Sequence, residues 1–255
     1  FFTFISTRLL TTDFDLKKVI SEGIQFITSG LFLSFMIFFL LISALVSFLR
    51  QMCINFGEAV FFNYVLGKYI EPEEEERSFM FIDLNNSTYI AEVLGHVKYS
   101  RFLNRCFDDI LDALEGYDFE VYQFVGDEIV LTWKTSKVDY GKAIKMYKSI
   151  HRRLGASSVF YKQKFKIAPK FKAAINSGKV IARMVGGKHK KMAYHGDVLN
   201  TTARLLELCN QYDESLLMTH SYLKSLNVPW AFRPIYLTSL RLRGKNSTSK
   251  IFTVN

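Results

Sequence analysis

Residues Phe81–Thr88 read FIDLNNST, and this stretch decides the fold because a lone aspartate ends an apolar run. The preceding run, SFMFIDL at Ser78–Leu84, is short, apolar and bounded by turn residues, which is typical of a strand buried on both faces of a sheet. Asp83 therefore stands at a strand end, where its carboxylate needs a partner. It either caps the backbone amides of the following turn or holds a cation such as Mg²⁺ through a hard oxygen ligand.

A second segment, Glu120–Trp133 (EVYQFVGDEIVLTW), predicts two strands joined by a tight hairpin at Gly126 and Asp127, a turn composition that supplies positive φ. Asp127 then lies at the tip of the hairpin. Two such aspartates placed side by side repel each other and raise one pKa unless a divalent ion neutralises them. The pair of Asp83 and Asp127 therefore favours a metal site more than either residue does alone.

A third segment, Gly196–Leu208 (GDVLNTTARLLEL), predicts a helix with Asp197 in its first turn. Asn200 and Arg204 are four residues apart, so a helix places both on one face, where an amide and a guanidinium can meet the same oxyanion. An ordinary solvated helix face shows the same spacing. This segment alone leaves both interpretations open.

Together, the three segments resemble the catalytic domain of the class III nucleotidyl cyclases, the family of adenylate and guanylate cyclases, over about Glu76–Asn255. The resemblance assigns two metal-binding aspartates to Asp83 and Asp127, and a backbone metal ligand to the carbonyl of Leu84. It implies an α/β (α+β) fold with a ferredoxin-like βαββαβ core and additions, preceded here by a transmembrane helix.

The same resemblance implies how a nucleoside triphosphate is bound. Asn200 and Arg204 match the pair that family members use on the ribose and the transferring phosphate. Phosphate binding is assigned to Lys172 in FKAAINSG, to Lys245 in LRGK, and to Ser87 and Thr88 after the first strand.

The implied reaction is an intramolecular phosphoryl transfer in which the ribose 3'-hydroxyl attacks the α-phosphate and pyrophosphate leaves. Two Mg²⁺ ions per site are expected, with Mn²⁺ as an alternative. In this family the metal aspartates and the Asn/Arg pair come from opposite subunits, so the resemblance also implies a homodimer with two composite sites.

Two positions depart from the family pattern for reading adenine, where adenylate cyclases typically carry Lys and Asp. They are Gln123 and Ala193, and neither is charged. Gln can donate and accept hydrogen bonds, so it suits adenine and also guanine. The glutamate of guanylate cyclases is absent at Gln123, so we predict an adenylate cyclase. The alternatives are a guanylate or other nucleotide cyclase, or a non-catalytic cyclase-like signalling module.

Leu31–Leu49 (LFLSFMIFFLLISALVSFL) is an uncharged run close to the roughly 20 residues that cross a bilayer, and it predicts a transmembrane helix over 31–50. Residues 1–30 are expected to be an aqueous loop or the end of an earlier span. The chain begins with Phe, so we expect it to be a truncated fragment. Arg50 gives a weak positive-inside signal that places the following domain in the cytoplasm, at the cell (inner) membrane.

Residues 51–76 are expected to couple the membrane to the catalytic domain. They carry apolar residues at mixed spacing and end at Glu71–Pro72 and the run Glu73–Glu76, which mark a boundary. The catalytic domain is therefore predicted over 77–255. Within it, the patterns predict helices over Ile90–Gly116 and Val138–Leu154, two strands (Phe171–Asn176 and Lys179–Met184) joined at Ser177–Gly178, and further strands at Ser215–Met218, Pro234–Leu242 and Lys250–Val254.

The formal net charge is +9, and the excess lies in 134–191, where Asp139 is the only acidic residue. Nucleic acid, an anionic membrane face and a polyphosphate substrate are the three partners that suit such a segment. The segment lacks the interleaved aromatic side chains of single-strand binders, so no nucleic acid is expected. A solvated face beside anionic lipid is the simplest interpretation for most of these lysines.

Overall fold

The computed structural model describes residues 16–56, 66–135, 141–186, 191–226, 232–240 and 248–254. The chain divides into two compact units, Phe1–Lys68 and Tyr69–Asn255. The first contains helices α2 (Leu16–Ile27) and α3 (Gly30–Phe56). Within α3, the stretch Gly30–Ile54 is long and apolar enough to cross a membrane, and none of it is buried within the protein. This helix contains the predicted span and continues beyond it.

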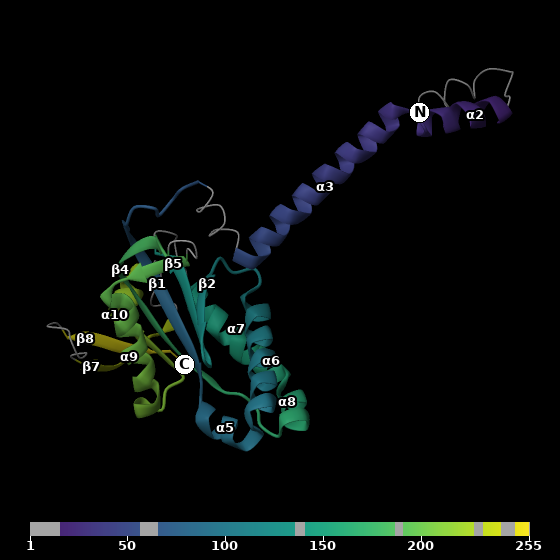
Figure 1. The fold of residues 1–255 in the computed structure, drawn as a ribbon. Helices are drawn as coiled ribbons and strands as arrows, with labels where there is room; N and C mark the ends of the chain where they lie inside the picture. The colour runs from purple at the N-terminus through teal and green to yellow at the C-terminus, as the bar shows by residue number, and fades with distance from the viewer. Residues whose placement is uncertain are drawn as a thin grey trace. The chain divides into compact units, whose positions relative to one another are not determined.

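The second unit is built on one sheet (Figure 1), which has eight strands among the described residues. Their order is β2-β3-β1-β4-β6-β8-β7, and β5 pairs with β4. The strands are β1 (Glu73–Leu84), β2 (Glu120–Val125), β3 (Glu128–Lys134), β4 (Phe171–Val185), β5 (Lys191–His195), β6 (Leu216–Thr219), β7 (Ile235–Leu240) and β8 (Ser249–Thr253). The helices are α5 (Ser87–Leu94), α6 (His96–Leu114), α7 (Lys142–Ala156), α8 (Ser158–Phe165), α9 (Asp197–Tyr212) and α10 (His220–Ser225).

The chain order of this unit confirms the ferredoxin-like core. Strand β1 is followed by α5 and α6, then by the β2–β3 hairpin, then by α7 and α8, and then by β4. The four strands lie in the order β2-β3-β1-β4, and every neighbouring pair is antiparallel. This is the βαββαβ arrangement, in which the crossover helices cover one face of the sheet.

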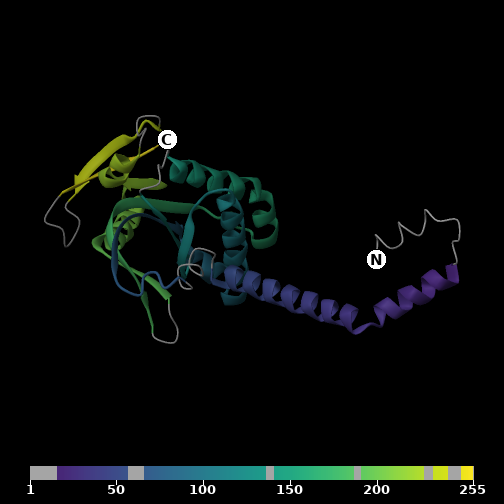
Figure 2. The same cartoon turned by 90° about the horizontal axis from the view of Figure 1, so that it is seen from above.

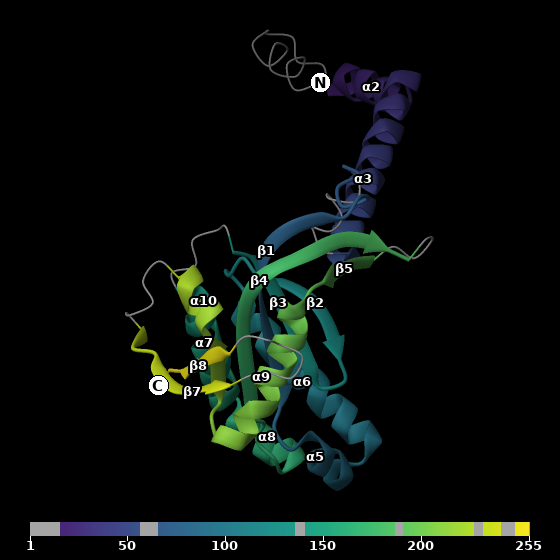
Figure 3. The ribbon, with the colours of Figure 1, turned by 90° about the vertical axis from the view of Figure 1, so that its left-hand side faces the viewer.

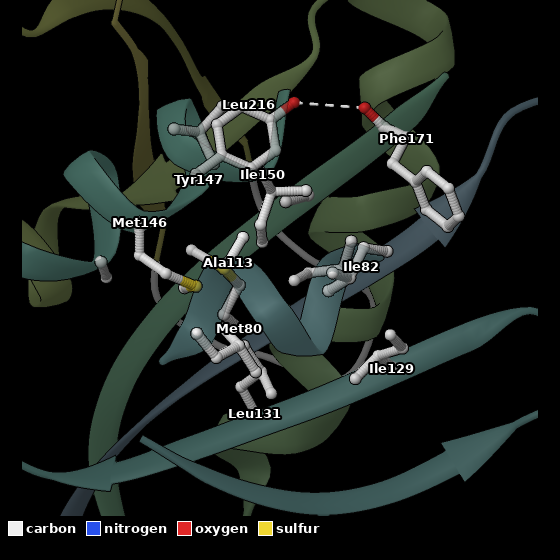
Figure 4. Packing of buried hydrophobic residues seen from close by; sticks show 14 of the residues in the cluster. Met80, Ile82, Ala113, Ile129, Leu131, Met146, Tyr147, Ile150, Phe171 and Leu216 are labelled. Atoms are coloured by element: carbon white, nitrogen blue, oxygen red, sulfur yellow. Dashed lines mark hydrogen bonds between the residues drawn. The ribbon is translucent and has the colours of Figure 1, made fainter. Parts of the chain in front are cut away.

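Both faces of the sheet are covered, so β1 is buried on each side as its apolar run predicts. Met80, Ile82 and Leu84 belong to a core beneath α6, α7 and α8, and Figure 4 shows part of this packing. Phe79 and Phe81 belong to a second core beneath α9. In Figure 2 the teal helices lie on one side of the sheet and the green α9 lies on the other, and Figure 3 shows α9 lying over β4.

Three predicted boundaries were wrong. The helix expected over Ile90–Gly116 is two helices, because Gly95 takes a φ of 70° between α5 and α6. The turn expected at Ser177–Gly178 is absent, since β4 runs unbroken there and pairs with Arg77 and Ser78 of β1. A further helix, α8, follows the helix predicted over Val138–Leu154, and the sequence patterns did not predict it.

Strand β1 also begins earlier than expected, at Glu73. The glutamates that we expected to precede the domain form the start of this strand, because cations on neighbouring strands offset their repulsion. Glu75 pairs with Lys134 of β3 at 2.7 Å, and Glu74 pairs with Lys179 of β4 at 2.7 Å.

Candidate active site

Asp83 lies near the end of β1 between two charged residues on neighbouring strands. Side chains alternate along a strand, so Asp83 shares the α9 face of the sheet with Phe79 and Phe81. In the strand register, Asp83 is directly opposite Lys172 of β4 and Glu128 of β3. The carboxylate therefore has a cation on one side and a second carboxylate on the other.

Lys172 forms the principal ion pair of this site. Its Nζ is 3.0 Å from Oδ2 of Asp83, and it also donates a hydrogen bond to Oδ1 of Asn210 at 3.3 Å. Lys172 is only 8% exposed. Asn210 belongs to the C-terminal part of α9, so the pair is held where this helix approaches the sheet.

Asp127 occupies the turn of the β2–β3 hairpin. Gly126 in this turn has a φ of 62°, which is positive as predicted. The structure brings Asp127 close to Asp83. Burial raises the pKa of Asp83, the ion pair with Lys172 opposes this rise, and the negative charge of Asp127 adds to it. Burial and these two aspartates together raise the pKa of Glu128 to about 7. The site therefore holds more negative charge than one lysine offsets.

This carboxylate pair fits a divalent cation that keeps some non-protein ligands. Within the ranges described above, no group of three or more His, Cys, Asp and Glu side chains could hold a metal. Mg²⁺ is usually held by one or two carboxylates, with water and substrate phosphates completing its shell, so Asp83 and Asp127 are sufficient. The Leu84 side chain is buried in the core, so its backbone carbonyl is the group that could join them.

Asn200 and Arg204 lie on α9, as predicted, but away from these carboxylates. Asn200 is exposed and Arg204 is half-buried. A helix rises about 1.5 Å per residue, so Arg204 is about 9 Å and Asn200 about 15 Å along the axis from Asn210, where α9 reaches Lys172. No hydrogen bond or ion pair in the described part of the chain joins either residue to Asp83 or Asp127. One chain does not bring the two halves of the predicted site together.

The start of α9 is fixed by a buried amide. Asn176 of β4 donates from Nδ2 to the carbonyl of Val198 at 3.2 Å, and its Oδ1 accepts from the Thr219 hydroxyl at 2.7 Å. Since both ends of the Asn176 amide are bonded, the first turn of α9 has a defined position on the sheet. This turn leads directly to Asn200.

Ser87 and Thr88 are the first two residues of α5, just after β1. Asn86 precedes them in the left-handed conformation, with a φ of 57°. The unpaired amides of a helix start suit a phosphate group. Ser87 also hydrogen-bonds Tyr99 through its side chain. Lys245, the fourth residue predicted to bind phosphate, lies outside the described residues.

The two proposed base-reading positions lie on β2 and β5. Gln123 is exposed and follows a register shift in β2, while Ala193 is half-buried on β5. Their sequence neighbours Tyr122 and Tyr194 pack edge to face, with ring centroids 5.1 Å apart. This contact brings the two strands together.

Sequence reasoning missed two residues of the site, Glu128 and Asn210. The hairpin register could have revealed Glu128, because the residue after the turn pairs with the end of β1. No local pattern indicated Asn210, since its contact with Lys172 depends on how α9 lies across the sheet.

Comparisons with known proteins show which family this chain resembles in sequence and fold. Residues 70–255 match the model of the Adenylate and Guanylate cyclase catalytic domain. Adenylate cyclase 2 of Rhizobium meliloti (strain 1021) is 29% identical over 199 residues, covering 78% of this chain and 55% of that protein. An adenylate cyclase of Anabaena cylindrica is 23% identical over 182 residues, covering 69% of this chain and 36% of that protein. The chain thus spans about half or less of these relatives.

Solved structures show the same fold. A bacterial light-regulated adenylyl cyclase superposes with a TM-score of 0.72 at 19% identity, covering 90% of this chain and 67% of that chain. The guanylyl cyclase Cya2 superposes with a TM-score of 0.63 at 17% identity, covering 72% of this chain and 93% of that chain. Because the family model covers most of the sequence, the chain belongs to the family of adenylate and guanylate cyclase catalytic domains, the class III nucleotidyl cyclases.

Proposed function

We propose that this nucleotidyl cyclase is a membrane-anchored adenylate cyclase that converts ATP into cyclic AMP and pyrophosphate. The observation that carries the proposal is the closeness of Asp83 and Asp127 beside the buried cation of Lys172. In the reaction, a bond forms between the ribose 3'-oxygen and the α-phosphorus, and the bond to the bridging oxygen of the β-phosphate breaks. The hydroxyl proton passes to solvent and pyrophosphate leaves.

Asp83, Asp127 and the Leu84 carbonyl would hold two Mg²⁺ ions, or Mn²⁺. Bound there, the ions lower the pKa of the attacking hydroxyl and offset charge on the phosphates. Lys172, with Lys245, Ser87 and Thr88, would bind the outer phosphates. Lys172 forms an ion pair with Asp83 from the neighbouring strand β4. A metal ion bound to Asp83 would replace Lys172 as the positive charge beside this carboxylate and would leave the lysine available to a phosphate.

Asn200 and Arg204 would act on the ribose and on charge developing at the α-phosphate, where fixed hydrogen-bond donors contribute most. Their separation of about 9 to 15 Å from Asn210 along α9 supports a site shared between two chains. We therefore infer a homodimer in which each site takes its carboxylates from one chain and this pair from the other.

Mixing two inactive variants tests the shared site. Asp83→Ala and Arg204→Ala chains should each be inactive, and their mixture should recover about a quarter of the wild-type rate if chains pair at random, because one site of each mixed dimer is intact. The control is Arg204→Ala mixed with Asn200→Ala, which damages the same half and should recover nothing. A mixture of folded Asp83→Ala and Arg204→Ala chains that stays inactive would contradict shared sites.

The choice of ATP rests on Gln123, which can pair with adenine, and on relatives that are named adenylate cyclases. Offering ATP, GTP, CTP and UTP separately to the purified chain tests it. We expect the highest kcat/KM with ATP, and a preference for GTP would overturn the choice. Gln123→Glu introduces the glutamate typical of guanylate cyclases and should raise GTP turnover relative to ATP.

The membrane anchor is proposed from α3, with the span at 31–50, the catalytic domain in the cytoplasm and residues 51–76 coupling the two. Alkaline carbonate extraction of membranes tests the anchor, and the chain should stay in the pellet. Its release would contradict a spanning helix. Single alanine insertions after Gln51 test coupling, and a rate that shows no periodic change with insertion number would argue against it.

A further inference from the structure

Helix α7 carries a stripe of cations on the side opposite to its buried face. Lys142, Lys145, Lys148 and Arg152 are all exposed. With 3.6 residues per turn, these four side chains lie within an arc of about 120°. The buried residues of α7 point the other way, into the core beneath the sheet. We refer to these four cations as the α7 stripe.

Residues 141–170 contain no Asp or Glu, so the sequence that includes the α7 stripe is strongly basic. The next helix, α8, adds the exposed cations Lys162 and Lys164. It also exposes Val159 and Phe160, which are 66% and 40% accessible. Cations beside exposed apolar side chains are typical of surfaces that lie on a bilayer, where the cations meet headgroups and the apolar groups enter the boundary region.

We propose that the α7 stripe binds anionic phospholipid headgroups of the membrane in which α3 is anchored. The proposal rests on the anchor proposed above, and it is independent of the cyclase reaction. If α3 spans a bilayer, the linker from Ile54 to Tyr69 reaches at most about 50 Å. The domain is therefore held near the lipid headgroups. Each contact between a cation and an anionic lipid strengthens binding only about fivefold, but tethering lets several such contacts act together.

The aromatic residues of α7 disfavour nucleic acid as the occupant. Tyr147 is buried and donates to the carbonyl of Phe171 at 3.2 Å, on the core side of the helix. His151 is also half-buried and packs against Tyr147. The α7 stripe thus lacks the stacking side chains that single-stranded nucleic acids require.

The test is site-resolved lysine acetylation of the full chain in lipid nanodiscs. One set of discs contains only zwitterionic phosphatidylcholine, and the other includes anionic phosphatidylglycerol. Lys145 and Lys148 should be acetylated about fivefold more slowly in the anionic discs. The exposed Lys98 and Lys224 serve as internal references and should react equally in both. Salt near 1 M, where the Debye length is about 3 Å, should abolish the difference.

Two variants that each lose four positive charges distinguish an effect of the α7 stripe from an effect of the overall net charge. Changing Lys142, Lys145, Lys148 and Arg152 to Gln should abolish the lipid-dependent protection of Lys162 on α8. Changing Lys98, Arg101, Lys224 and Lys250 to Gln should preserve it. Equal acetylation of the α7 stripe in the two lipids would overturn the proposal, and protection by added single-stranded RNA but not by anionic lipid would reassign the surface.

Failure of the anchor has a different outcome. A chain without a spanning helix would not enter the discs, which would contradict the anchor. In that case the chain would be acetylated in the presence of anionic or zwitterionic vesicles, and slower acetylation of Lys145 and Lys148 with the anionic vesicles would support the lipid proposal. Equal rates would overturn it.

Discussion

Replacing Lys172 with methionine removes one positive charge from the candidate site and keeps most of the side chain's volume. In the structure, the Lys172 and Asp83 side chains are only 10% and 21% exposed, and the charged atoms are 3.0 Å apart. At an effective dielectric constant of about 20, their attraction is about 5 kcal/mol before desolvation is subtracted. Removing one partner of a buried pair costs about 3–5 kcal/mol. We expect about 3 kcal/mol here, because Asp83 is one-fifth exposed.

The same substitution should have opposite effects on metal binding and on turnover. Without Lys172, no ammonium competes for Asp83, so the nucleotide-free chain should bind Mn²⁺ on the order of tenfold more tightly, a gain of about 1.4 kcal/mol. The variant also loses a charged phosphate contact, so kcat with ATP should fall by a factor on the order of 100. A merely destabilised protein would lose both properties together.

Three measurements follow the variant: chemical denaturation without metal, calorimetric titration with Mn²⁺, and steady-state turnover. Lys179→Met is the matched control, since Lys179 pairs with Glu74 at 2.7 Å but the two side chains are 66% and 57% exposed. This control should resemble the wild type in all three measurements. The reasoning is refuted if Lys172→Met binds Mn²⁺ with unchanged or weaker affinity.

Three other substitutions test the fold around the site. Asp109 is fully buried and accepts a hydrogen bond from the Tyr161 hydroxyl at 2.7 Å, so Asp109→Ala should lower the free energy of unfolding by about 3–5 kcal/mol. The control is Asp112→Ala, which changes an exposed aspartate and should cost under about 1 kcal/mol. Equally small losses for both variants would contradict the prediction. Burial lowers the pKa of His151, so the unfolded chain binds more protons than the folded chain, and stability should fall as the pH drops below about 6.5. Thermal melts should show a smaller fall for His151→Gln than for the wild type. The same pH profile for both chains would count against this role of His151. Gly126 takes a φ of 62°, so Gly126→Ala should cost about 1–2 kcal/mol in denaturation and Gly126→Asn less; equal costs would exclude backbone strain as the cause.

Much of the fold was predictable because its signals are local. The apolar run before Asp83 predicted a strand buried on both faces, and Gly126 predicted a hairpin with positive φ. The spacing of Asn200 and Arg204 predicted one helix face. Each of these features depends on a few neighbouring residues, and the structure contains all of them.

The remaining features depend on residues that are distant in sequence. Ser177–Gly178 has the composition of a turn, but pairing along the full length of β1 keeps β4 extended. The glutamate run at Glu73–Glu76 has the composition of a linker, but cations on β3 and β4 place it in the sheet. The contact between Lys172 and Asp83 likewise arises only when β1 and β4 lie side by side.

We propose above that Asp83 and Asp127 hold the metal ions of a nucleotide-cyclising site. The most direct test measures cyclic AMP and pyrophosphate formed from ATP and Mg²⁺ by the full chain and by Asp127→Asn, which keeps the side chain's size and removes its charge. We expect equal amounts of the two products from the wild type and a rate at least about 100-fold lower from the folded variant. Equal rates from both chains, or no cyclic product from any of the four nucleoside triphosphates, would contradict the claim.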